Sequence, residues 1–445
     1  MDIQLPKSVQ DILDKFDNAD YEIYVVGGAV RDILMGKITN DWDFTTSATP
    51  EEILKIISDG FYDNQFGTVG LSVEGFERPF EITTFRSEEG YSDARHPDKI
   101  SWGKSLKEDI ERRDFTINSM AIDKDLKIID LFNGQKDIDA KKIRAVGDPD
   151  ARFAEDALRM MRAVRIGAEL GFTIEEKTFE AIKKSAPLIN KIAKERVKDE
   201  LFKLIASANP YEGMILFRTS GLMAEILPEM EKCFGVEQKS PGRHHIYDVG
   251  THLLMSLKNC QSEDTITRFA TLIHDIGKPQ TYRKLENGTI TFYNHEMVST
   301  KIAENIAERL RFSRKETDKL IALVRWHQFT VDEHQTDSAI RRILKNVGPE
   351  YISDMLILRV ADRLGGGARE TSWRLEEFKK RLVEVQKEPF SVRDLKIDGN
   401  DVMKELNMKP GPEVGKILSD LFEKVVNKEV ENEKEGLLKA LTPQA

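Results

Sequence analysis

The chain has 445 residues, of which 40% are hydrophobic and 32% charged, which excludes a single small domain and a disordered chain. No run approaches the roughly 20 apolar residues of a membrane-spanning helix, the N-terminus lacks a secretory pattern, and two cysteines cannot form a disulfide framework, so we expect a cytoplasmic protein without a membrane partner. The net charge of −10 argues against indiscriminate coating of nucleic acid, but a local basic surface could still recognise a folded RNA.

Short strand patterns dominate the first part of the chain. The first strand, YEIYVV at 21–26, runs into the adjacent Gly27 and Gly28, which open a helix. A second helix is predicted for EEILKIIS at 51–58, with a capped start in which Thr49 is the N-cap and Pro50 takes the first helical position. Further strands are predicted at 41–45, 68–74, 79–85, 115–122 and 126–132. This pattern predicts an α+β domain built on a small mixed sheet.

From about Ala151 the hydrophobic pattern becomes helical. A long helix is predicted over 155–172, with Gly171 as its natural C-cap. Further helices are predicted at 175–185, 195–207, 210–219, 249–260, 265–274, 296–311, 314–327, 336–345, 350–363, 369–386 and 412–427. We therefore expect an α+β head, a helical neck, a helical body and a helical tail, bounded as 1–140, 141–205, 206–390 and 391–445.

The first candidates for chemistry are the Gly27-Gly28 turn and the motif Asp41-Trp42-Asp43. Adjacent glycines let the backbone approach a triphosphate, and the start of a helix offers free N–H groups to anions. If Asp41 and Asp43 lie on one strand, their carboxylates share a face and could hold Mg²⁺ for two-metal catalysis. A purely structural turn and a solvent-facing Asp pair are the alternatives.

Three other side chains fit the same site. Glu81, in the apolar strand PFEITTF, is a third carboxylate for the metal pair. Arg112 and Arg113 form a basic pair that can hold phosphate oxygens in a bidentate manner, although a surface charge cluster would look the same. Together they favour a catalytic site that binds a triphosphate.

A series of motifs resembles the class II tRNA nucleotidyltransferases. The motifs are GGAVRD with DWD, RRDFTIN, DLFNGQKDID, EDALR and ERVKDE, and they follow one another in that family's order over roughly residues 22–205. The resemblance implies a polymerase-β-like head with catalytic Asp41, Asp43 and Glu81 and bound Mg²⁺. It further implies addition of C, C and A to the 3′ end of tRNA from CTP and ATP. The expected nucleotide-binding residues are Gly28, Arg31, Arg112, Arg113, Asn118, Asp156, Arg159, Arg162 and Arg165.

Asp156 and Arg159, three residues apart, would share a face of the predicted helix. A surface ion pair is the simplest interpretation. However, C and A both present an amino donor beside a ring-nitrogen acceptor, which a carboxylate and a guanidinium can match. U and G reverse this pattern and would leave both side chains mismatched. The family resemblance assigns this base-reading role to Asp156 and Arg159.

The polar segment 86–102 resembles a flexible loop that full CCA-adding enzymes use in moving from C to A addition and that CC-adding relatives lack. Its presence favours CCA or A addition without separating the two. A plain long loop is the alternative.

Most histidines lie between His244 and His334, which suggests a separate metal-binding module. A His–Asp dipeptide with a distant His and a distant Asp resembles the HD phosphohydrolase superfamily and implies an HD domain at about 245–365. The implied ligands are His252, His274, Asp275 and Asp362. Nitrogen and oxygen donors suit Mn²⁺, Ni²⁺, Fe²⁺ or Mg²⁺ better than a structural zinc, and such a site could activate water toward a phosphate ester. His295 and His327 are candidates for a second metal position, and a vestigial site is the alternative.

Other functions remain open from the sequence. One is A-only addition to tRNA, and another is a bacterial poly(A) polymerase, which shares the first motifs but makes long tails on other RNAs. The HD site could also carry the main activity beside an RNA-binding head. A non-catalytic RNA-binding protein fits worst, because it has no need for carboxylates at these positions. We expect tRNA to be recognised by shape through basic surface such as Lys191, Lys194 and Lys198, which could equally be an ordinary solvated helix face.

Overall fold

The computed structural model describes residues 3–62, 67–89, 99–102, 105–238, 246–329, 337–386, 392–426 and 429–441. It divides into two compact units, one of Met1–Val236 with Asn305–Ser313 and one of Glu237–Glu304 with Arg314–Ala445. An α+β head is followed by helices, which confirms the predicted fold class. None of the described helices is long and apolar enough to cross a membrane.

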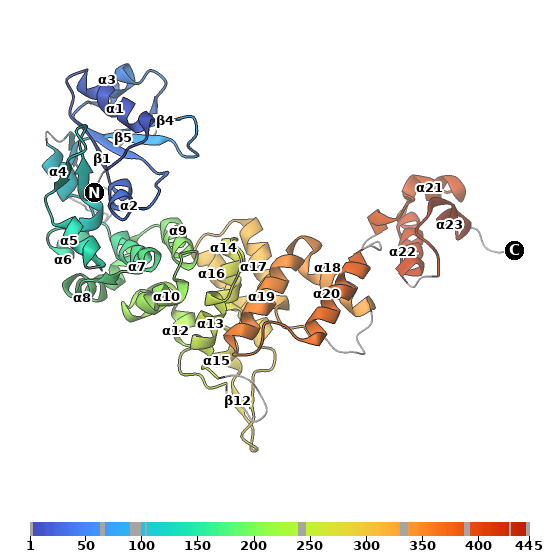
Figure 1. The fold of residues 1–445 in the computed structure, drawn as a ribbon. Coiled ribbons are helices and arrows are strands. Elements are labelled where there is room, and N and C mark those ends of the chain that lie inside the picture. Colours follow the sequence, from blue (N-terminus) through green and yellow to red (C-terminus); the bar gives the residue numbers. More distant parts are fainter. Residues whose placement is uncertain are drawn as a thin grey trace. The chain divides into compact units, whose positions relative to one another are not determined.

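The head is built on a seven-stranded mixed sheet (Figure 1). Its strand order is β3-β4-β5-β2-β1-β8-β9, in which β2 and β5 pair in parallel and the other neighbours pair antiparallel. The strands are β1 Ile23–Val26, β2 Asp43–Thr46, β3 Phe61–Tyr62, β4 Thr68–Leu71, β5 Phe80–Thr84, β8 Met120–Ile122 and β9 Ile128–Asp130. In a separate two-stranded sheet, β6 Arg86–Glu89 pairs antiparallel with β7 Lys99–Trp102, and the rest of the predicted flexible loop lies outside the described residues.

Helices cover both faces of this sheet. Ile23 of β1, Phe44 of β2 and Ile82 of β5 face one hydrophobic core, which is completed by three helices, α1 Lys7–Asp17, α2 Gly28–Leu34 and α3 Pro50–Ile56. On the other face, α4 Leu106–Glu111 packs against Val26 and Ala121. Side chains alternate along strands, so Asp43 and Glu81, direct neighbours in the parallel β2–β5 register, both lie on the face opposite to Phe44.

Two of the predicted strands are wrong in part. β2 begins at Asp43, so Asp41 precedes the strand instead of lying on it. Residues 115–122 do not form one strand, because a 3₁₀ helix, Thr116–Asn118, precedes β8. The cause is local side-chain bonding, which competes with strand pairing. The Asp114 carboxylate accepts a hydrogen bond from Phe115 N at 2.8 Å, and Ser119 Oγ donates to the Phe115 carbonyl at 2.8 Å.

The long helix predicted over 155–172 begins later, at Leu158, and a short helix that the sequence did not predict precedes it. α6 Pro149–Glu155 and α7 Leu158–Leu170 are separated at Asp156, whose backbone is extended with φ −141° and ψ 103°. Asp156 Oδ1 accepts a hydrogen bond from Leu158 N at 3.0 Å, so it satisfies one of the free N–H groups at the start of α7. α7 ends at Gly171 in the left-handed conformation, as predicted.

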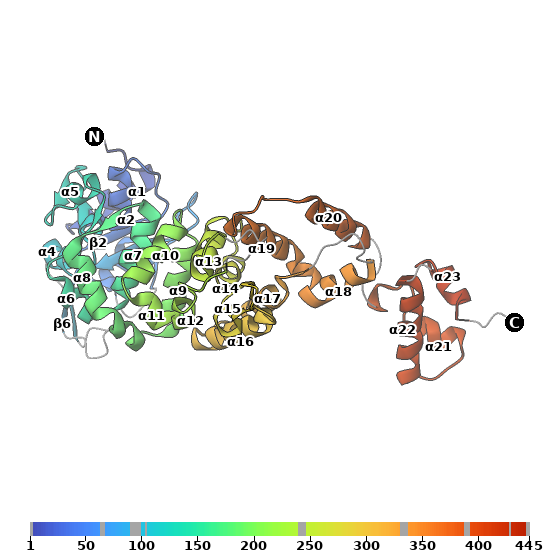
Figure 2. The ribbon, with the colours of Figure 1, turned by 90° about the horizontal axis from the view of Figure 1, so that it is seen from below.

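The remaining neck helices pack closely around a glycine. A Cβ at Gly213 of α10 would lie 2.7 Å from the side chains of Ala168 and Leu204, so glycine lets α10 approach both α7 and α9. Figures 1 and 2 show these three helices side by side. The elements of this region are α5 Gly134–Asp139, β10 Lys142–Ile143, β11 Thr173–Ile174, α8 Glu176–Ser185, η2 Ala186–Lys191, α9 Lys194–Ile205, α10 Pro210–Thr219, α11 Leu222–Ile226 and α12 Pro228–Glu231.

The described residues of the second unit are helical apart from one small hairpin, and its helix α16 continues into the first unit from Asn305. Gly365 of α19 packs directly on Ser256 of α13, because any Cβ there would collide with that serine. The tail has its own hydrophobic cluster, which includes Val402, Val414 and Leu437. The elements are α13 Val249–Lys258, α14 Thr265–Ile273, α15 Lys278–Thr281, β12 Arg283–Lys284, β13 Ile290–Thr291, α16 His295–Arg309, α17 Arg314–Trp326, α18 Asp337–Val347, η3 Pro349–Tyr351, α19 Ile352–Gly365, α20 Trp373–Gln386, η4 Val392–Asp394, α21 Gly399–Glu405, α22 Pro412–Val426 and α23 Lys434–Lys439.

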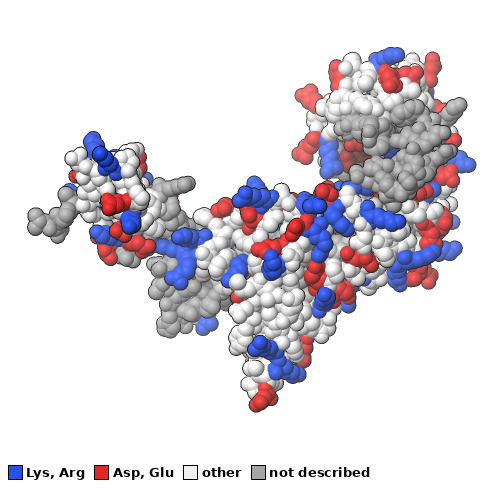
Figure 3. All heavy atoms as spheres, turned by 180° about the vertical axis from the view of Figure 1, so that it is seen from behind, with Lys and Arg blue, Asp and Glu red and all other residues white. Residues whose placement is uncertain are grey.

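Charges of both signs are mixed on the surface. On the face drawn in Figure 3, Lys and Arg side chains are interspersed with Asp and Glu.

Candidate active sites

A cavity of about 280 Å³ lies between the first turn of the head and the start of the neck. We call it the head cavity. It brings together four segments that are far apart in the sequence. Its lining residues are Gly27, Gly28, Asp43, Arg112, Arg113, Asp114, Asn118, Asp156, Arg159 and Arg162. Most of the predicted nucleotide-binding residues therefore meet in one place.

Two features of this cavity require a glycine at position 27, its backbone conformation and the lack of space for a Cβ. Its φ is +77°, a conformation that other residues rarely adopt. A Cβ at this position would also lie 3.0 Å from Asp43 Oδ2 and 3.4 Å from Arg113 Nη1. Only glycine therefore lets a carboxylate, a guanidinium and the backbone converge at the first turn.

The predicted metal carboxylates do not all converge. Asp43 lines the cavity, whereas Asp41 pairs with Arg78 at 3.0 Å on the surface. Glu81 is exposed on β5 beside Asp43. Among the described residues, no set of three clustered metal-ligand side chains includes Asp41, Asp43 or Glu81. The roles given to these three residues stay predictions.

Asp43 is nevertheless suited to bind a cation. Burial raises the pKa of Asp43; Arg113 lowers it, and the carboxylate of Asp41 raises it further. A buried carboxylate with another carboxylate nearby is stabilised in its charged form by a bound cation. Carboxylate oxygens are also the donors that Mg²⁺ prefers. The residues present thus fit a magnesium ion at this position.

Arg31 does not line the cavity but contacts a residue that does. Its Nη1 donates to Asn118 Oδ1 at 2.8 Å, and its Nε donates to Asp32 at 2.9 Å. Arg31 thus ties α2 to the 3₁₀ helix of the RRDFTIN motif and orients the Asn118 side chain.

Arg112 and Arg113 are held by a carboxylate that was not among the predicted site residues. Asp109 of α4 is fully buried and pairs with Arg112 at 2.6 Å and with Arg113 at 3.2 Å. An acidic residue three positions before one arginine and four before the next shares a helix face with both. That spacing was the signal that could have identified Asp109.

Asp156 and Arg159 both line the head cavity, but they do not share a regular helix face. Asp156 lies at the break between α6 and α7, and its Oδ2 accepts from Arg196 Nη2 at 3.0 Å. Arg159 Nη1 donates to Glu155 at 2.6 Å, and its Nη2 donates to the Arg112 carbonyl at 3.0 Å. The predicted base-reading pair is thus oriented by contacts from the head and from α9.

Arg162 and Arg165 lie in different surroundings. Arg162 lines the cavity and pairs with Asp114 at 2.7 Å. Burial alone would raise the pKa of Asp114, but the guanidiniums of Arg162 and Arg159 hold this pKa below its usual range. This buried carboxylate was not among the predicted site residues. Arg165 is absent from the cavity lining and pairs with Glu200 at 2.6 Å inside the neck, so its predicted contact with nucleotide has no support in the geometry.

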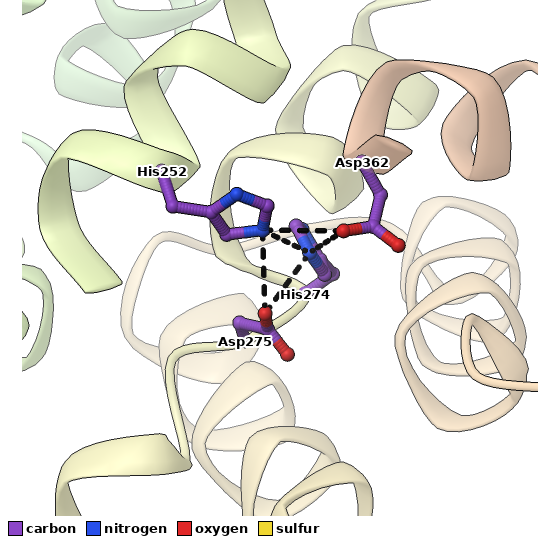
Figure 4. Close-up of side chains that lie close together, drawn as sticks. All are labelled: His252, His274, Asp275 and Asp362. Atoms are coloured by element: carbon purple, nitrogen blue, oxygen red, sulfur yellow. Dashed lines mark hydrogen bonds and ion pairs between the residues drawn. The ribbon is translucent and has the colours of Figure 1, made fainter. Parts of the chain in front are cut away.

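The second unit brings the predicted HD residues together (Figure 4). We call His252, His274, Asp275 and Asp362 the inner cluster; one potential metal-ligand atom from each lies within 4.8 Å of the others. His252 is on α13, His274 caps α14, and Asp362 is on α19. Their side chains point toward one another (Figure 4), with His252 Nε2 3.2 Å from Asp362 Oδ1 and 3.4 Å from Asp275 Oδ2.

A second set of potential ligands adjoins the first. Asp275, His295 and His327 form what we call the outer cluster. The Nε2 atoms of His295 and His327 lie 3.0 and 3.4 Å from Asp275 Oδ1, whereas Oδ2 of the same carboxylate faces the inner cluster. Asp275 therefore lies between two positions, an inner one with two imidazoles and two carboxylates and an outer one with two imidazoles and the shared Asp275 carboxylate.

Hydrogen bonds to backbone carbonyls orient three of the imidazole rings for metal binding. Nδ1 of His274, His295 and His327 lies 2.8, 2.8 and 2.7 Å from the carbonyl three residues earlier. A carbonyl only accepts, so Nδ1 carries the proton and Nε2 of the neutral ring is left for a metal.

The charges of the inner cluster are strongly coupled when no metal is bound. Although burial alone would lower it, Asp275 and Asp362 raise the pKa of His274 to about 10. Burial alone would raise the pKa of Asp275, but Lys278 and His274 hold it well below its usual range. The cluster is thus arranged to hold positive charge, as a metal site requires.

A cavity of about 530 Å³ opens beside the outer cluster. His295, His327, Asp275 and Asp362 line it, whereas His252 and His274 do not. Its cationic lining residues are Lys278, Arg359 and Arg363. A pocket with potential metal ligands on one wall and these cations beside them suits a phosphate ester.

The head fold and the head cavity define a nucleotidyltransferase. Residues 23–144 match the family model of the poly A polymerase head domain. Residues 171–234 match a model described as a probable RNA and SrmB-binding site of polymerase A, and 286–441 match a putative tRNA nucleotidyltransferase domain 2.

The chain belongs to the family of CCA-adding enzymes. It is 34% identical to the CCA-adding enzyme of Limosilactobacillus reuteri, over 98% of this chain and 96% of that protein. The identity to that of Latilactobacillus sakei is 35%, over 96% of both chains.

Solved structures agree with this assignment. The crystal structure of the Bacillus stearothermophilus CCA-adding enzyme in complex with CTP matches with a TM-score of 0.72 and 28% identity, over 98% of this chain and 97% of that one. The Thermotoga maritima CCA-adding enzyme complexed with tRNA shares the fold, with a TM-score of 0.56 at 18% identity, over 99% and 96%. These comparisons confirm the predicted enzyme class and the polymerase-β-like head, whereas the HD assignment stays a prediction.

Proposed function

We propose that the head and neck add C, C and A to the 3′ end of tRNA from CTP and ATP without a nucleic-acid template. The observation that carries this proposal is that Asp156 and Arg159 line the same cavity as Asp43 and Arg113. A base-reading pair and a phosphate-transfer site thus lie within reach of one nucleotide. The relatives named above are CCA-adding enzymes, which supports the same conclusion.

The phosphate end of the nucleotide would lie against the head. Gly27 and Gly28 let the backbone approach the triphosphate. Arg112 and Arg113 bind its oxygens and offset the charge that develops during transfer. Asp43, with Asp41, would hold Mg²⁺, which when bound favours loss of the proton from the tRNA 3′-hydroxyl and neutralises the leaving pyrophosphate.

The base would lie against the neck. The Asp156 carboxylate accepts from the amino group of C or A, and the Arg159 guanidinium donates to the neighbouring ring nitrogen. Uracil and guanine present a carbonyl and a ring N–H at these places, so two desolvated groups would be left mismatched. Because the reading groups are side chains, selection needs no template strand.

The test is nucleotide addition to three tRNA transcripts that lack CCA, end in C, or end in CC. Each is incubated with CTP, ATP or both in the presence of Mg²⁺, and the products are resolved at single-nucleotide length. We expect growth by three nucleotides on the shortest transcript, lost in Asp43→Ala. Growth from the CC end alone would mean an A-adding enzyme, and long tails on other RNAs would mean a poly(A) polymerase. No growth on any transcript would contradict the proposal.

We propose a second activity, hydrolysis of a phosphate ester, for the HD site. The observation that favours it is the pair of ligand clusters that share Asp275 and open on a cationic cavity. Mn²⁺, Ni²⁺, Fe²⁺ or Mg²⁺ held there would lower the pKa of a water molecule and polarise the ester. Lys278 and Arg359 would bind the phosphate oxygens.

The test of this second activity separates it from nucleotide addition. Release of phosphate from p-nitrophenyl phosphate and bis(p-nitrophenyl) phosphate is measured with each metal. We expect His274→Ala to abolish hydrolysis while Asp43→Ala leaves it intact. Equal hydrolysis by wild type and His274→Ala would contradict the HD assignment.

A further inference from the structure

Asp109 is the buried carboxylate behind the two arginines of the head cavity. Its Oδ1 accepts from Arg112 Nε at 3.0 Å and from Arg112 Nη2 at 2.6 Å. Its Oδ2 accepts from Arg113 Nη2 at 3.2 Å. Asp109 itself is 0% exposed and does not line the cavity, whereas both arginines do.

The contacts of Asp109 extend beyond these two side chains. Arg113 reaches the Gly27 turn with its other terminal nitrogen, Nη1. The carbonyl of Arg112 accepts from Arg159 Nη2 at 3.0 Å. One carboxylate therefore holds two guanidiniums, and one of these two arginines, Arg112, also contacts Arg159 through its carbonyl.

This arrangement has a clear energetic consequence. Two neighbouring guanidiniums repel each other, and two long side chains lose rotamer freedom when they bind a ligand. Charge-assisted bonds to a buried carboxylate offset both costs before the nucleotide arrives. Although burial alone would raise it, Arg112 and Arg113 hold the pKa of Asp109 below its usual range, so the carboxylate is charged at neutral pH.

We propose that Asp109 is a positioning residue for nucleotide binding and base selection, acting through Arg112, Arg113 and Arg159 without touching the nucleotide. This inference rests on the proposed function of the head. It predicts that loss of the carboxylate weakens the binding of the triphosphate and loosens the reading of the base together.

The test compares Asp109→Asn with wild type in single-nucleotide addition to a tRNA transcript lacking CCA. We expect the KM for CTP to rise on the order of tenfold, because an Arg–carboxylate interaction is lost, with a smaller change in kcat. The preference for CTP over UTP should fall several-fold. Equilibrium dialysis with labelled CTP gives the same comparison without turnover.

A matched control separates positioning from stability. Glu229 pairs with Arg309 at 2.7 Å in the same unit and does not line the cavity. Glu229→Gln also breaks an Arg–carboxylate pair, but we expect it to keep the wild-type KM and CTP preference. If Asp109 had a purely structural role, Asp109→Asn would behave like Glu229→Gln, with at most a lower active fraction and with KM and preference unchanged.

Asp109→Glu provides a second test, which also serves if the Asn variant does not fold. It keeps the charge but displaces it by one methylene, so we expect a KM between those of wild type and Asp109→Asn. Wild-type KM and preference in a folded Asp109 variant would overturn the inference while leaving the proposed function intact. An inactive wild type would overturn the proposed function and this inference with it.

Discussion

Arg196 of α9 lies 3.0 Å from Asp156, which separates α6 from α7. The other carboxylate oxygen of Asp156 accepts from Leu158 N, so both oxygens are engaged. An extended residue between two helices has many rotamers open to it, and these two contacts select one. The ERVKDE motif thus fixes the direction of the predicted base-reading carboxylate.

Replacement of Arg196 by Gln should therefore reduce base selection. We expect the preference for CTP over UTP to fall about tenfold, because the Asp156 carboxylate loses a charge-assisted partner. The measurement is the ratio of kcat/KM for the two nucleotides on one tRNA transcript. Arg218→Gln, which breaks the 2.8 Å pair with Glu231, is the matched control. An unchanged ratio in Arg196→Gln would show that Asp156 is oriented by other contacts.

A methyl group at Gly27 should block the head cavity. Gly27→Ala has to adopt φ +77° and also bring a Cβ within 3.0 Å of Asp43 Oδ2. We expect nucleotide addition to fall roughly a hundredfold, because displaced reacting groups cost about that much. Gly36→Ala is the control, since it imposes a similar φ of +67° with nothing within 4 Å. Both variants should lose similar stability in thermal melts, and an equal loss of activity in both would refute a local effect.

The sequence predicted the fold well wherever one local signal was sufficient. Thr49 and Pro50 mark the start of α3, and Gly171 ends α7 in the left-handed conformation. These features depend on the preferences of single residues, which a sequence displays directly. Asp114 and Ser119, in contrast, form hydrogen bonds with the local backbone, and a 3₁₀ helix forms where a strand was predicted.

The candidate sites were predictable as lists of residues but not as geometry. The HD motif residues do converge, because their helices pack around them. The sequence could not show that Asp41 contacts Arg78, or that Arg165 is engaged by Glu200. The ion-pair partner of each side chain depends on tertiary contacts between distant segments, and the motif spacing carries no information about these contacts.

Acid should destabilise the first unit partly through Glu229. Although burial alone would raise it, the hydrogen bonds from Arg309 help hold the pKa of Glu229 below 4.5. A carboxyl with a lowered folded-state pKa contributes stability above its unfolded value, and this is lost as pH falls through the folded value. We therefore expect the free energy of unfolding, measured in urea, to fall more steeply below pH 4.5 in wild type than in Glu229→Gln. Glu180→Gln, at an exposed carboxylate, should keep the wild-type slope, and identical slopes in all three would contradict the assignment.

Metal content should reveal two unequal positions in the HD site. We expect two Mn²⁺ or Ni²⁺ ions per chain by elemental analysis after dialysis, because Asp275 serves both ligand clusters. His295→Ala should retain one ion, and Asp275→Asn should lose both. The inner ion should exchange more slowly with a chelator, since His252 and His274 are buried away from the cavity. Asp43→Asn in the head is the control and should keep both ions. Retention of two ions by Asp275→Asn would rule out a carboxylate shared between the two positions.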